Sequence, residues 1–184
     1  PFVWISNELL KTLVHKWRSE EQAILIGSKT AIKDNPELTT RNWPGKSPIR
    51  LVINRNANLP ETLKIFDNKV KTIIFNEKFD SINGNLEYKK VDFGKNLLKD
   101  ILRYLYDIEI QSIIVEGGAI TLKNFIEEEL WDEARVIIGN KYFYNGIKAP
   151  YLECEPDEEY FFCGDKLRIY YNKKHINSLN CLLM

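Results

Sequence analysis

Short runs of apolar, often β-branched residues, each followed by a turn residue, constrain this sequence more than any other feature. The run Ala23–Gly27 is the clearest example, because its apolar residues end at a glycine. Runs of this length between turn residues are typical of strands that are buried on both faces. On this pattern we predict strands at 23–27, 50–54, 71–75, 86–93, 112–116 and 134–138.

Segments with apolar residues at helical spacing separate several of these strands. The first runs from Leu9 to Trp17, with Ser6 as the expected N-cap. A short helical turn at 30–34 is expected to end before Pro36, because proline cannot continue a helix. Two further helices are predicted at 97–105 and 119–129.

The alternation of strands and helices predicts an α/β fold with a mostly parallel central sheet flanked by helices. The segments 160–163 and 166–171, divided by Gly164-Asp165, are predicted to form a C-terminal antiparallel hairpin at the end of this sheet. A length of 184 residues suits one domain, which we place at 1–172, followed by a less patterned tail at 173–184.

The composition excludes several classes of function. Lysine plus arginine equals aspartate plus glutamate, 26 each, so no overall charge attracts nucleic acid or an anionic membrane. Three cysteines without CxxC spacing, and two histidines, predict neither a disulfide framework nor a metal site. The longest apolar runs are far shorter than the roughly 20 residues that span a bilayer. These features predict a cytoplasmic protein without zinc.

The segment Ile113–Ala119 is the most informative local motif. A buried strand delivers Glu116 to its carboxyl end, Gly117 and Gly118 allow a sharp turn, and a helix follows at once. Ligands of open α/β sheets collect at this edge, and the free N–H groups of a helix start favour phosphate. The alternative is a tight strand–helix turn with a solvated Glu116.

The segment from Gly27 to Arg41 also follows a strand, and it concentrates hydroxyl groups, one acid and one arginine around Pro36. It lacks the glycine spacing of a phosphate-binding Walker loop. Taken alone, it favours a capped turn in which Asp34 and Thr39 satisfy backbone donors.

Arg18 borders the apolar face of the first helix, because it lies four residues after Val14. An arginine in this place can bind a phosphate through two N–H groups, or it can extend its charged end into water. His15 is expected at the surface. Without a Ser–His–Asp arrangement, the chemistry that fits best is one in which a cofactor supplies the reactive atom, such as hydride transfer.

The chain resembles the C-terminal reductase domain of the bacterial bifunctional riboflavin-biosynthesis deaminase/reductase. The resemblance covers about residues 4 to 139. The pairing of the D-x-P-x-L-T-x-R pattern with a later E-G-G-A is its most specific part. The matching segments are Trp4–Ser6, His15–Arg18, Ala23–Ser28, Asp34–Arg41, Pro48–Arg55, Ile114–Ala119 and Leu130–Glu133.

This resemblance implies a fold like that of dihydrofolate reductase, a homodimer, and NADPH as the cofactor. The implied reaction reduces the ribosyl group of 5-amino-6-(5-phosphoribosylamino)uracil to the ribityl group. The implied substrate positions are Arg18, Leu38, Arg41 and Glu116. The implied nucleotide positions are Trp4, Thr30, Asp34 and the run Gly118, Ala119, Ile120, Thr121, Leu122, Lys123 and Asn124. Of these residues, Glu116 and Asp34 are the catalytic candidates.

Arg55 is a separate hypothesis, because it follows a strand where many relatives have a small hydroxyl residue. Its guanidinium could bind the 2′-phosphate that distinguishes NADPH from NADH. The alternative is a solvated cation in a turn.

The sequence departs from the family in three ways. Phe2 stands where a polar residue is usual, and neither the family's first strand, which is expected before Trp4, nor the zinc-binding deaminase domain is among the residues of this sequence. Two other functions stay open. One is a dihydrofolate-reductase-like enzyme for another heterocycle, and the other is a degenerate binding or dimerisation module without catalysis.

Overall fold

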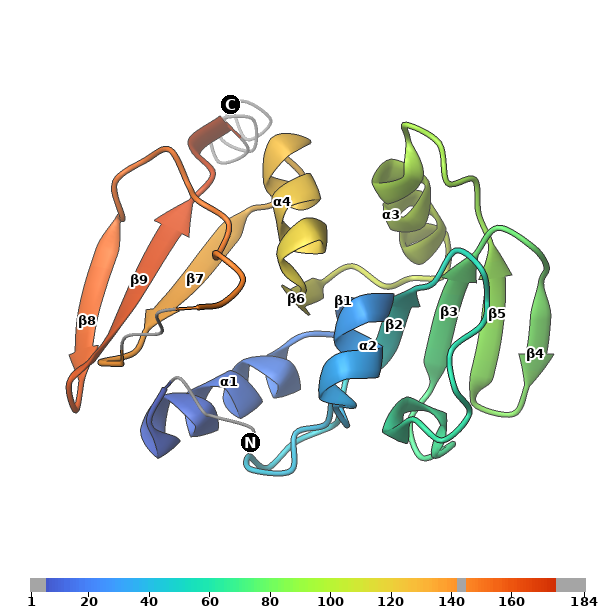
Figure 1. Ribbon diagram of the computed structural model, residues 1–184, viewed down its shortest axis with the longest axis horizontal. Helices are drawn as coiled ribbons and strands as arrows, with labels where there is room; N and C mark the ends of the chain where they lie inside the picture. Colours follow the sequence, from blue (N-terminus) through green and yellow to red (C-terminus); the bar gives the residue numbers. More distant parts are fainter. Residues whose placement is uncertain (1–5, 142–144, 175–184) are drawn as a thin grey trace. The chain divides into compact units, whose positions relative to one another are not determined.

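The computed structural model describes residues 6–141 and 145–174, which form two compact units. One unit is the continuous segment Val14–Leu122, and the other joins the segments before residue 14 and after residue 122. The ribbon in Figure 1 follows the chain through both units. No helix among the described residues is long and apolar enough to cross a membrane.

The first unit contains a six-stranded sheet in the order β4-β5-β3-β2-β1-β6. The strands β1, β2, β3, β5 and β6 are parallel, and β4 pairs antiparallel with β5. The mostly parallel sheet is therefore confirmed. The strand bounds are β1 Ala23–Gly27, β2 Ile49–Ile53, β3 Thr72–Asn76, β4 Ser81–Asn83, β5 Leu86–Lys90 and β6 Ile113–Gly117.

The central strands β1, β2 and β3 are buried on both faces, and alternate residues of each strand contact opposite layers. Ile24, Val52 and Ile74 pack in one core cluster with Ala31 of α2 (Ser28–Asp34) and Ile65 of the 3₁₀ turn η1 (Lys64–Phe66). On α3 (Leu97–Asp107) the buried residues are Leu98, Ile101 and Leu105. The ring of Tyr104 meets Phe75 edge to face, with the centroids 6.0 Å apart.

Two predicted boundaries are wrong for local reasons. Ser6 is not the N-cap of α1 (Glu8–Glu20); Asn7 is, because its Oδ1 accepts the backbone N–H of Leu10 at 3.0 Å. The predicted strand 86–93 ends at Lys90, and the exposed strand β4 before it was not predicted. The turn at Gly84, where φ is +58°, folds β4 back onto β5.

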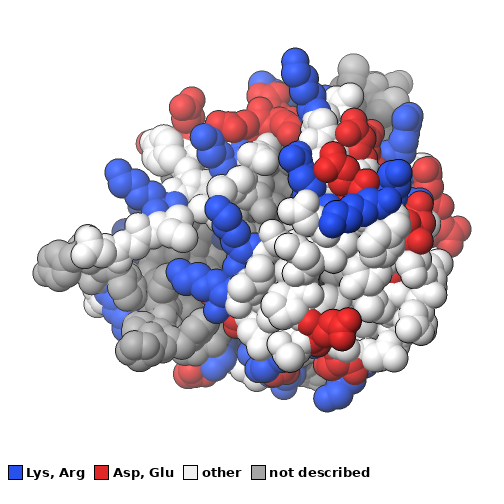
Figure 2. All heavy atoms as spheres, turned by 45° about the vertical axis from the view of Figure 1, so that its right-hand side comes forward, with Lys and Arg blue, Asp and Glu red and all other residues white. Residues whose placement is uncertain are grey.

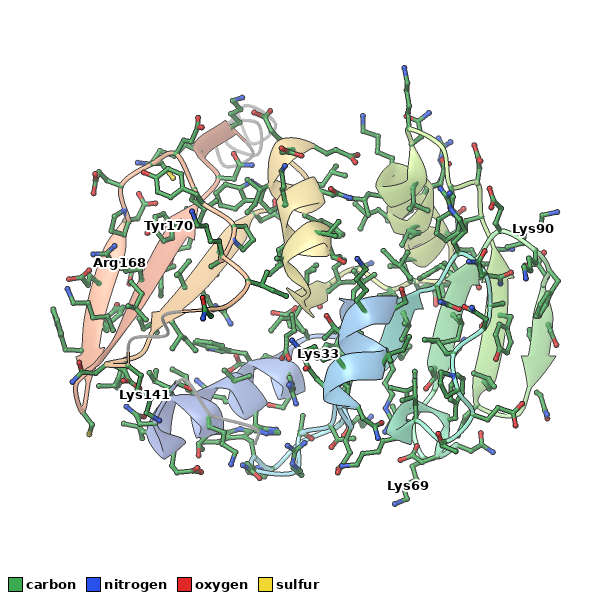
Figure 3. The ribbon with its side chains drawn as sticks, in the orientation of Figure 1. Lys33, Lys69, Lys90, Lys141, Arg168 and Tyr170 are labelled. Carbon is green, nitrogen blue, oxygen red and sulfur yellow. The ribbon has the colours of Figure 1, made fainter. Side chains whose placement is uncertain are left out.

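The second unit contains a three-stranded antiparallel sheet in the order β7-β9-β8. Its strands are β7 (Glu133–Ile138), β8 (Glu158–Phe162) and β9 (Asp165–Tyr171), and Arg168 on β9 is labelled in Figure 3. The predicted hairpin exists, but it pairs with β7 rather than with the parallel sheet. Its turn is Cys163-Gly164, one residue earlier than predicted, and both turn residues have positive φ.

Asp165 connects three segments of this second unit. Its carboxylate is almost fully buried and accepts the backbone N–H groups of Asn7 at 2.7 Å and Asn140 at 3.0 Å. The side chain of Asn7 in turn donates to the carbonyl of Phe162 at 2.7 Å. The start of α1 is thereby fixed to the hairpin.

Candidate functional site

Glu116 lies in an irregularity at the carboxyl end of β6. Leu25 of β1 pairs with Val115, but the next residue, Ile26, pairs with Gly117, so Glu116 is an extra residue in β6. Such a bulge bends the strand and redirects the side chain of the extra residue, and bulges are common beside active sites. The register of β6 therefore explains why Glu116 leaves the core pattern of its strand.

The redirected carboxylate of Glu116 forms a two-pronged ion pair with Arg18 of α1. Nε of Arg18 donates to Oε1 at 2.6 Å, and Nη2 donates to Oε2 at 2.5 Å. The side chains are 11% and 20% exposed, so the pair is largely shielded from water. Planar pairs of this kind are among the strongest hydrogen bonds between side chains. Arg18 therefore does not extend into water, and Glu116 is not simply solvated.

The segment after α2 joins the same cluster through its backbone. Nη1 of Arg18 donates to the carbonyl of Thr39 at 3.1 Å. Leu38 has a φ of +56°, and its side chain is buried in the core cluster at 1% exposure. Any contact of Leu38 with a substrate must therefore come from its backbone.

Arg41 follows this segment and is exposed. It forms no hydrogen bond or ion pair with the part of the chain that the structure describes. It follows Thr39, whose carbonyl binds Arg18, by two residues, and its charge helps to lower the pKa of His15. Arg41 thus places a cation that has no partner among the described residues on the segment that the carbonyl of Thr39 connects to Arg18.

His15 is buried, with an exposed fraction of only 2%, so the prediction of a surface residue is wrong. Burial is the main cause that lowers its pKa below the ordinary value, and the charges of Arg18 and Arg41 act in the same direction. The backbone of Thr39 and the carboxylate of Glu116 oppose this shift. The only sequence signal for this location is the spacing of three residues between His15 and Arg18, which places both on one side of α1.

A second cluster forms where α2 and α4 (Ala119–Glu127) begin. A Cβ on Gly118 would lie 2.8 Å from Oγ1 of Thr30, and a Cβ on Gly27 would lie 2.7 Å from Oγ1 of Thr121. The two helix starts are therefore in direct contact, and only glycine allows this approach. The peptide bond between Gly117 and Gly118 is cis.

The predicted nucleotide residues of α4 occupy the first two turns of this helix. The first helical hydrogen bond runs from the N–H of Leu122 to the carbonyl of Gly118 at 3.1 Å. The amides of Ala119, Ile120 and Thr121 consequently have no acceptor within the helix. Lys123 and Asn124 are exposed on the following turn.

Two predicted site residues lie outside both clusters. Asp34 ends α2 and is exposed, and its carboxylate accepts no hydrogen bond from the described residues; the neighbouring Asn35, not Asp34, accepts the backbone N–H of Lys64 at 2.8 Å. Arg55 follows β2, donates to the carbonyl of Phe93 at 3.0 Å and lies 5.1 Å from the centre of its ring. Trp4 and Phe2 fall outside the described residues.

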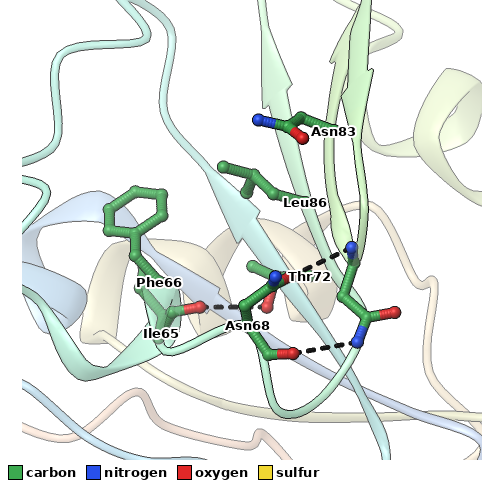
Figure 4. Close-up of a pocket in the computed structure, with 7 residues that line it drawn as sticks. Ile65, Phe66, Asn68, Thr72, Asn83 and Leu86 are labelled. Atoms are coloured by element: carbon green, nitrogen blue, oxygen red, sulfur yellow. Dashed lines mark hydrogen bonds between the residues drawn. The ribbon is translucent and has the colours of Figure 1, made fainter.

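A pocket occurs at the other edge of the sheet, where β3 and β5 begin with Thr72 and Leu86 (Figure 4). The backbone N–H of Asn85 donates there to Oδ1 of Asn68 at 3.0 Å, and the side-chain amide of Asn85 donates to the carbonyl of Asn68 at 2.9 Å. These polar groups therefore satisfy one another. The described residues contain no group of three or more His, Cys, Asp or Glu that could hold a metal ion.

Comparison with known proteins gives the family directly. The RibD C-terminal domain family matches residues 3–143, and the chain belongs to this family. The chain is 33% identical over 162 residues to riboflavin biosynthesis protein RibD of Aquifex aeolicus, covering 85% of this chain and 45% of that protein. It is 28% identical to the 2,5-diamino-6-ribosylamino-4(3H)-pyrimidinone 5′-phosphate reductase of Archaeoglobus fulgidus, covering 79% of this chain and 74% of the reductase.

A solved structure supports the same assignment. The deaminase/5-amino-6-(5-phosphoribosylamino)uracil reductase of Thermotoga maritima superposes with a TM-score of 0.80 at 27% identity, covering 91% of this chain and 50% of that one. The chain spans about half the length of the RibD proteins that it matches. The predicted family and the reductase fold are therefore confirmed.

The contact between the two helix starts leads to a prediction about Gly118. Gly118→Ala should lower the free energy of unfolding by about 1–3 kcal/mol, the usual cost of overpacking, because the new methyl group meets Oγ1 of Thr30. Thr30→Ala should relieve this cost, whereas Thr30→Val should not, because valine keeps a methyl group in the same place. Urea unfolding of the single and double variants measures the effect. If Gly118→Ala costs the same in the Thr30→Ala background as in the unchanged protein, the contact is contradicted.

Proposed function

We propose that the chain reduces the ribosyl group of 5-amino-6-(5-phosphoribosylamino)uracil to the ribityl group, with NADPH as the hydride donor. The observation that carries this proposal is the pairing of Arg18 with Glu116, next in the sequence to the glycine turn that starts α4. Residues 1–172 would form the reductase domain, acting as a homodimer in the cytoplasm, with a deaminase domain fused upstream in the complete protein.

The arrangement of residues fits a dinucleotide phosphate. The free amides at the start of α4 and the helix dipole favour an anion, and the hydroxyl groups of Thr30 and Thr121 lie beside them. The bound cofactor would supply a hydride, and the residues of this chain orient the substrate to receive it. The amides from Ala119 to Thr121 would hold the pyrophosphate, with Lys123, Asn124 and Trp4 as further contacts.

Glu116 would orient the substrate as a hydrogen-bond acceptor. A carboxylate offers about four acceptor positions, and Arg18 uses two of them here. The remaining positions can accept ribose hydroxyl groups or a pyrimidine N–H. Because Arg18 holds both oxygen atoms, the carboxylate has a fixed direction before the substrate arrives, which reduces the entropy lost on binding.

The two arginines have different roles in this proposal. Arg18 has about five N–H donors, three of which are used by Glu116 and Thr39, so it mainly positions other groups. Arg41 keeps all of its donors, and a guanidinium matches the geometry of a phosphate. Arg41 would therefore be the principal contact of the 5-phosphate, together with the backbone of Leu38.

Asp34 and Arg55 would extend the nucleotide site beyond the starts of α2 and α4. Asp34 lies one turn after Thr30 on α2, where its free carboxylate can accept ribose hydroxyl groups. Arg55 is held by Phe93 and by a weak ion pair with Glu77 at 3.9 Å, which leaves several of its N–H groups available. Arg55 would bind the 2′-phosphate of NADPH.

The face that Figure 2 presents carries charges of both signs, with Lys and Arg side chains beside Asp and Glu side chains. Among the described residues, Lys89 pairs with Asp80 at 3.4 Å and Lys71 pairs with Glu87 at 3.1 Å. Anion binding is therefore expected at local pockets and not over a broad basic patch.

Turnover of NADPH with the purified protein tests the reaction itself. The phosphoribosylaminouracil should be reduced faster than the 2,5-diamino-6-ribosylamino-4(3H)-pyrimidinone 5′-phosphate that the archaeal relative is named for. A preference for the diamino compound would show that this compound, and not the phosphoribosylaminouracil, is the substrate. Absence of turnover with both compounds would reject the proposed function.

Arg41→Ala should lower kcat/KM for the phosphorylated substrate by about tenfold or more, which corresponds to at least about 1.4 kcal/mol. The same variant should change kcat/KM for the dephosphorylated analogue less than twofold, because that analogue lacks the group that Arg41 binds. Arg103→Ala removes an exposed arginine of α3 and serves as the control. Equal losses with the two substrates would exclude Arg41 as the phosphate contact.

Arg55→Ala should raise the KM for NADPH much more than the KM for NADH. The reason is that only NADPH carries the 2′-phosphate, and a guanidinium contact to phosphate is charge-assisted. Steady-state kinetics with each cofactor measures the difference. A similar increase for both cofactors would show that Arg55 is only a structural residue of its turn.

A further inference from the structure

Two buried side-chain nitrogen atoms have no hydrogen-bond partner among the described residues: Nδ1 of His15 and Nε of Arg50. Arg50 is otherwise satisfied, because its other nitrogen atoms donate to Asp67 and to the carbonyl of Ile65. His15 is different, because an imidazole has only two nitrogen atoms and one of them, Nδ1, is left without a partner among those residues. An unsatisfied buried polar atom typically costs about 1–3 kcal/mol, so its persistence calls for an explanation.

The surroundings of His15 favour a neutral imidazole. Its charged neighbours are Arg18 on its own helix, Arg41 after α2 and Glu116 at the end of β6, and burial together with the two arginines lowers its pKa. The backbone of Thr39 also interacts with the ring. A neutral imidazole has one N–H donor and one acceptor nitrogen. With the donor directed to Thr39, the unpartnered Nδ1 is an acceptor that needs a donor.

Arg41 has hydrogen-bond donors that lack an acceptor in the described part of the chain. It is exposed, and none of its N–H donors is used within the described residues. Arg18, the other cation near His15, already gives three donors to Glu116 and Thr39. The backbone of Thr39 interacts with His15, and Arg41 is only two residues further along the chain, so an unpartnered buried acceptor and an unused donor belong to adjoining segments.

We propose that His15 is a positioning residue of the substrate site, whose Nδ1 accepts a hydrogen bond from Arg41 when the guanidinium turns inward onto the substrate phosphate. This inference rests on the proposed function, because it assigns a partner to the phosphate contact named there. His15 itself does not touch the substrate. Its role is to hold one edge of the Arg41 guanidinium, so that the other N–H groups face the phosphate.

The proposal has a defined dependence on pH. Because the pKa of His15 lies below its ordinary value of 6.5, the ring is neutral at pH 7 and can accept the bond. As the pH falls through the lowered pKa, the ring gains a proton, loses its acceptor and adds a positive charge next to Arg18 and Arg41. Phosphate binding should therefore weaken on the acid side.

Three substitutions separate this role from a merely structural one. Asparagine can place its amide oxygen near the position of Nδ1, glutamine reaches the position of Nε2, and leucine supplies neither. His15→Leu should raise the KM for the phosphorylated substrate about tenfold while kcat changes less than twofold. His15→Asn should restore most of the loss, and His15→Gln should not. Rescue by glutamine alone would assign the role to the contact with Thr39 and overturn the proposal.

A double-mutant cycle with Arg41 tests the partner directly. In the Arg41→Ala background, His15→Asn and His15→Leu should have nearly equal KM values, because the donor that distinguishes them is missing. A persistent tenfold difference between them in that background would contradict the pairing. If the leucine variant does not fold, the asparagine variant is compared with the glutamine variant in the same two backgrounds.

A measurement without turnover separates this proposal from the proposed function. The sequence has two histidines, so His175→Gln leaves His15 as the single imidazole signal in nitrogen NMR. Ribose 5-phosphate should shift the Nδ1 resonance towards that of a hydrogen-bonded acceptor, and Arg41→Ala should abolish the shift. This result without enzyme turnover would reject the reaction but keep the pairing. Turnover with an unchanged Nδ1 resonance would reject the pairing alone.

Discussion

The ion pair between Arg18 and Glu116 is the interaction on which the candidate site depends. It joins α1, the carboxyl end of β6 and, through the carbonyl of Thr39, the segment after α2. Breaking such a shielded pair by removing one partner leaves an uncompensated charge. The pair therefore keeps three segments in place that are far apart in the sequence, and it gives the carboxylate a fixed direction.

The glycines have a separate role next to this pair. Gly27 and Gly118 let the starts of α2 and α4 come into contact, which brings the free amides of α4 close to the hydroxyl groups of two threonines. The bulge at Glu116 is what allows one short strand to serve both clusters: its side chain turns to Arg18, and the next residues begin the glycine turn. Under the proposed function, substrate and nucleotide would thus contact consecutive residues.

Much of the fold was predictable because buried parallel strands and amphipathic helices leave strong local patterns. All eight predicted strands, the two of the hairpin included, and all four predicted helices exist, and the resemblance identified the family correctly. The predictions that failed concern competition between neighbours. Asn7 displaces Ser6 as the cap because Asp165 holds its backbone, and the hairpin joins β7 because antiparallel pairing partners are not encoded in local periodicity. The burial of His15 and the bulge at Glu116 depend on segments that are not adjacent in the sequence. Arg18 and Glu116, for example, are 98 positions apart, so no local pattern reports their contact.

The coupling free energy between Arg18 and Glu116 tests the central claim most directly. It is obtained from urea unfolding of Arg18→Met, Glu116→Gln and the double variant, compared with the unchanged protein. The structure predicts a coupling of about 1–3 kcal/mol, because the pair is two-pronged and largely shielded from water. A coupling below about 0.5 kcal/mol, within the usual error of additivity, would show that the two residues do not organise the site together.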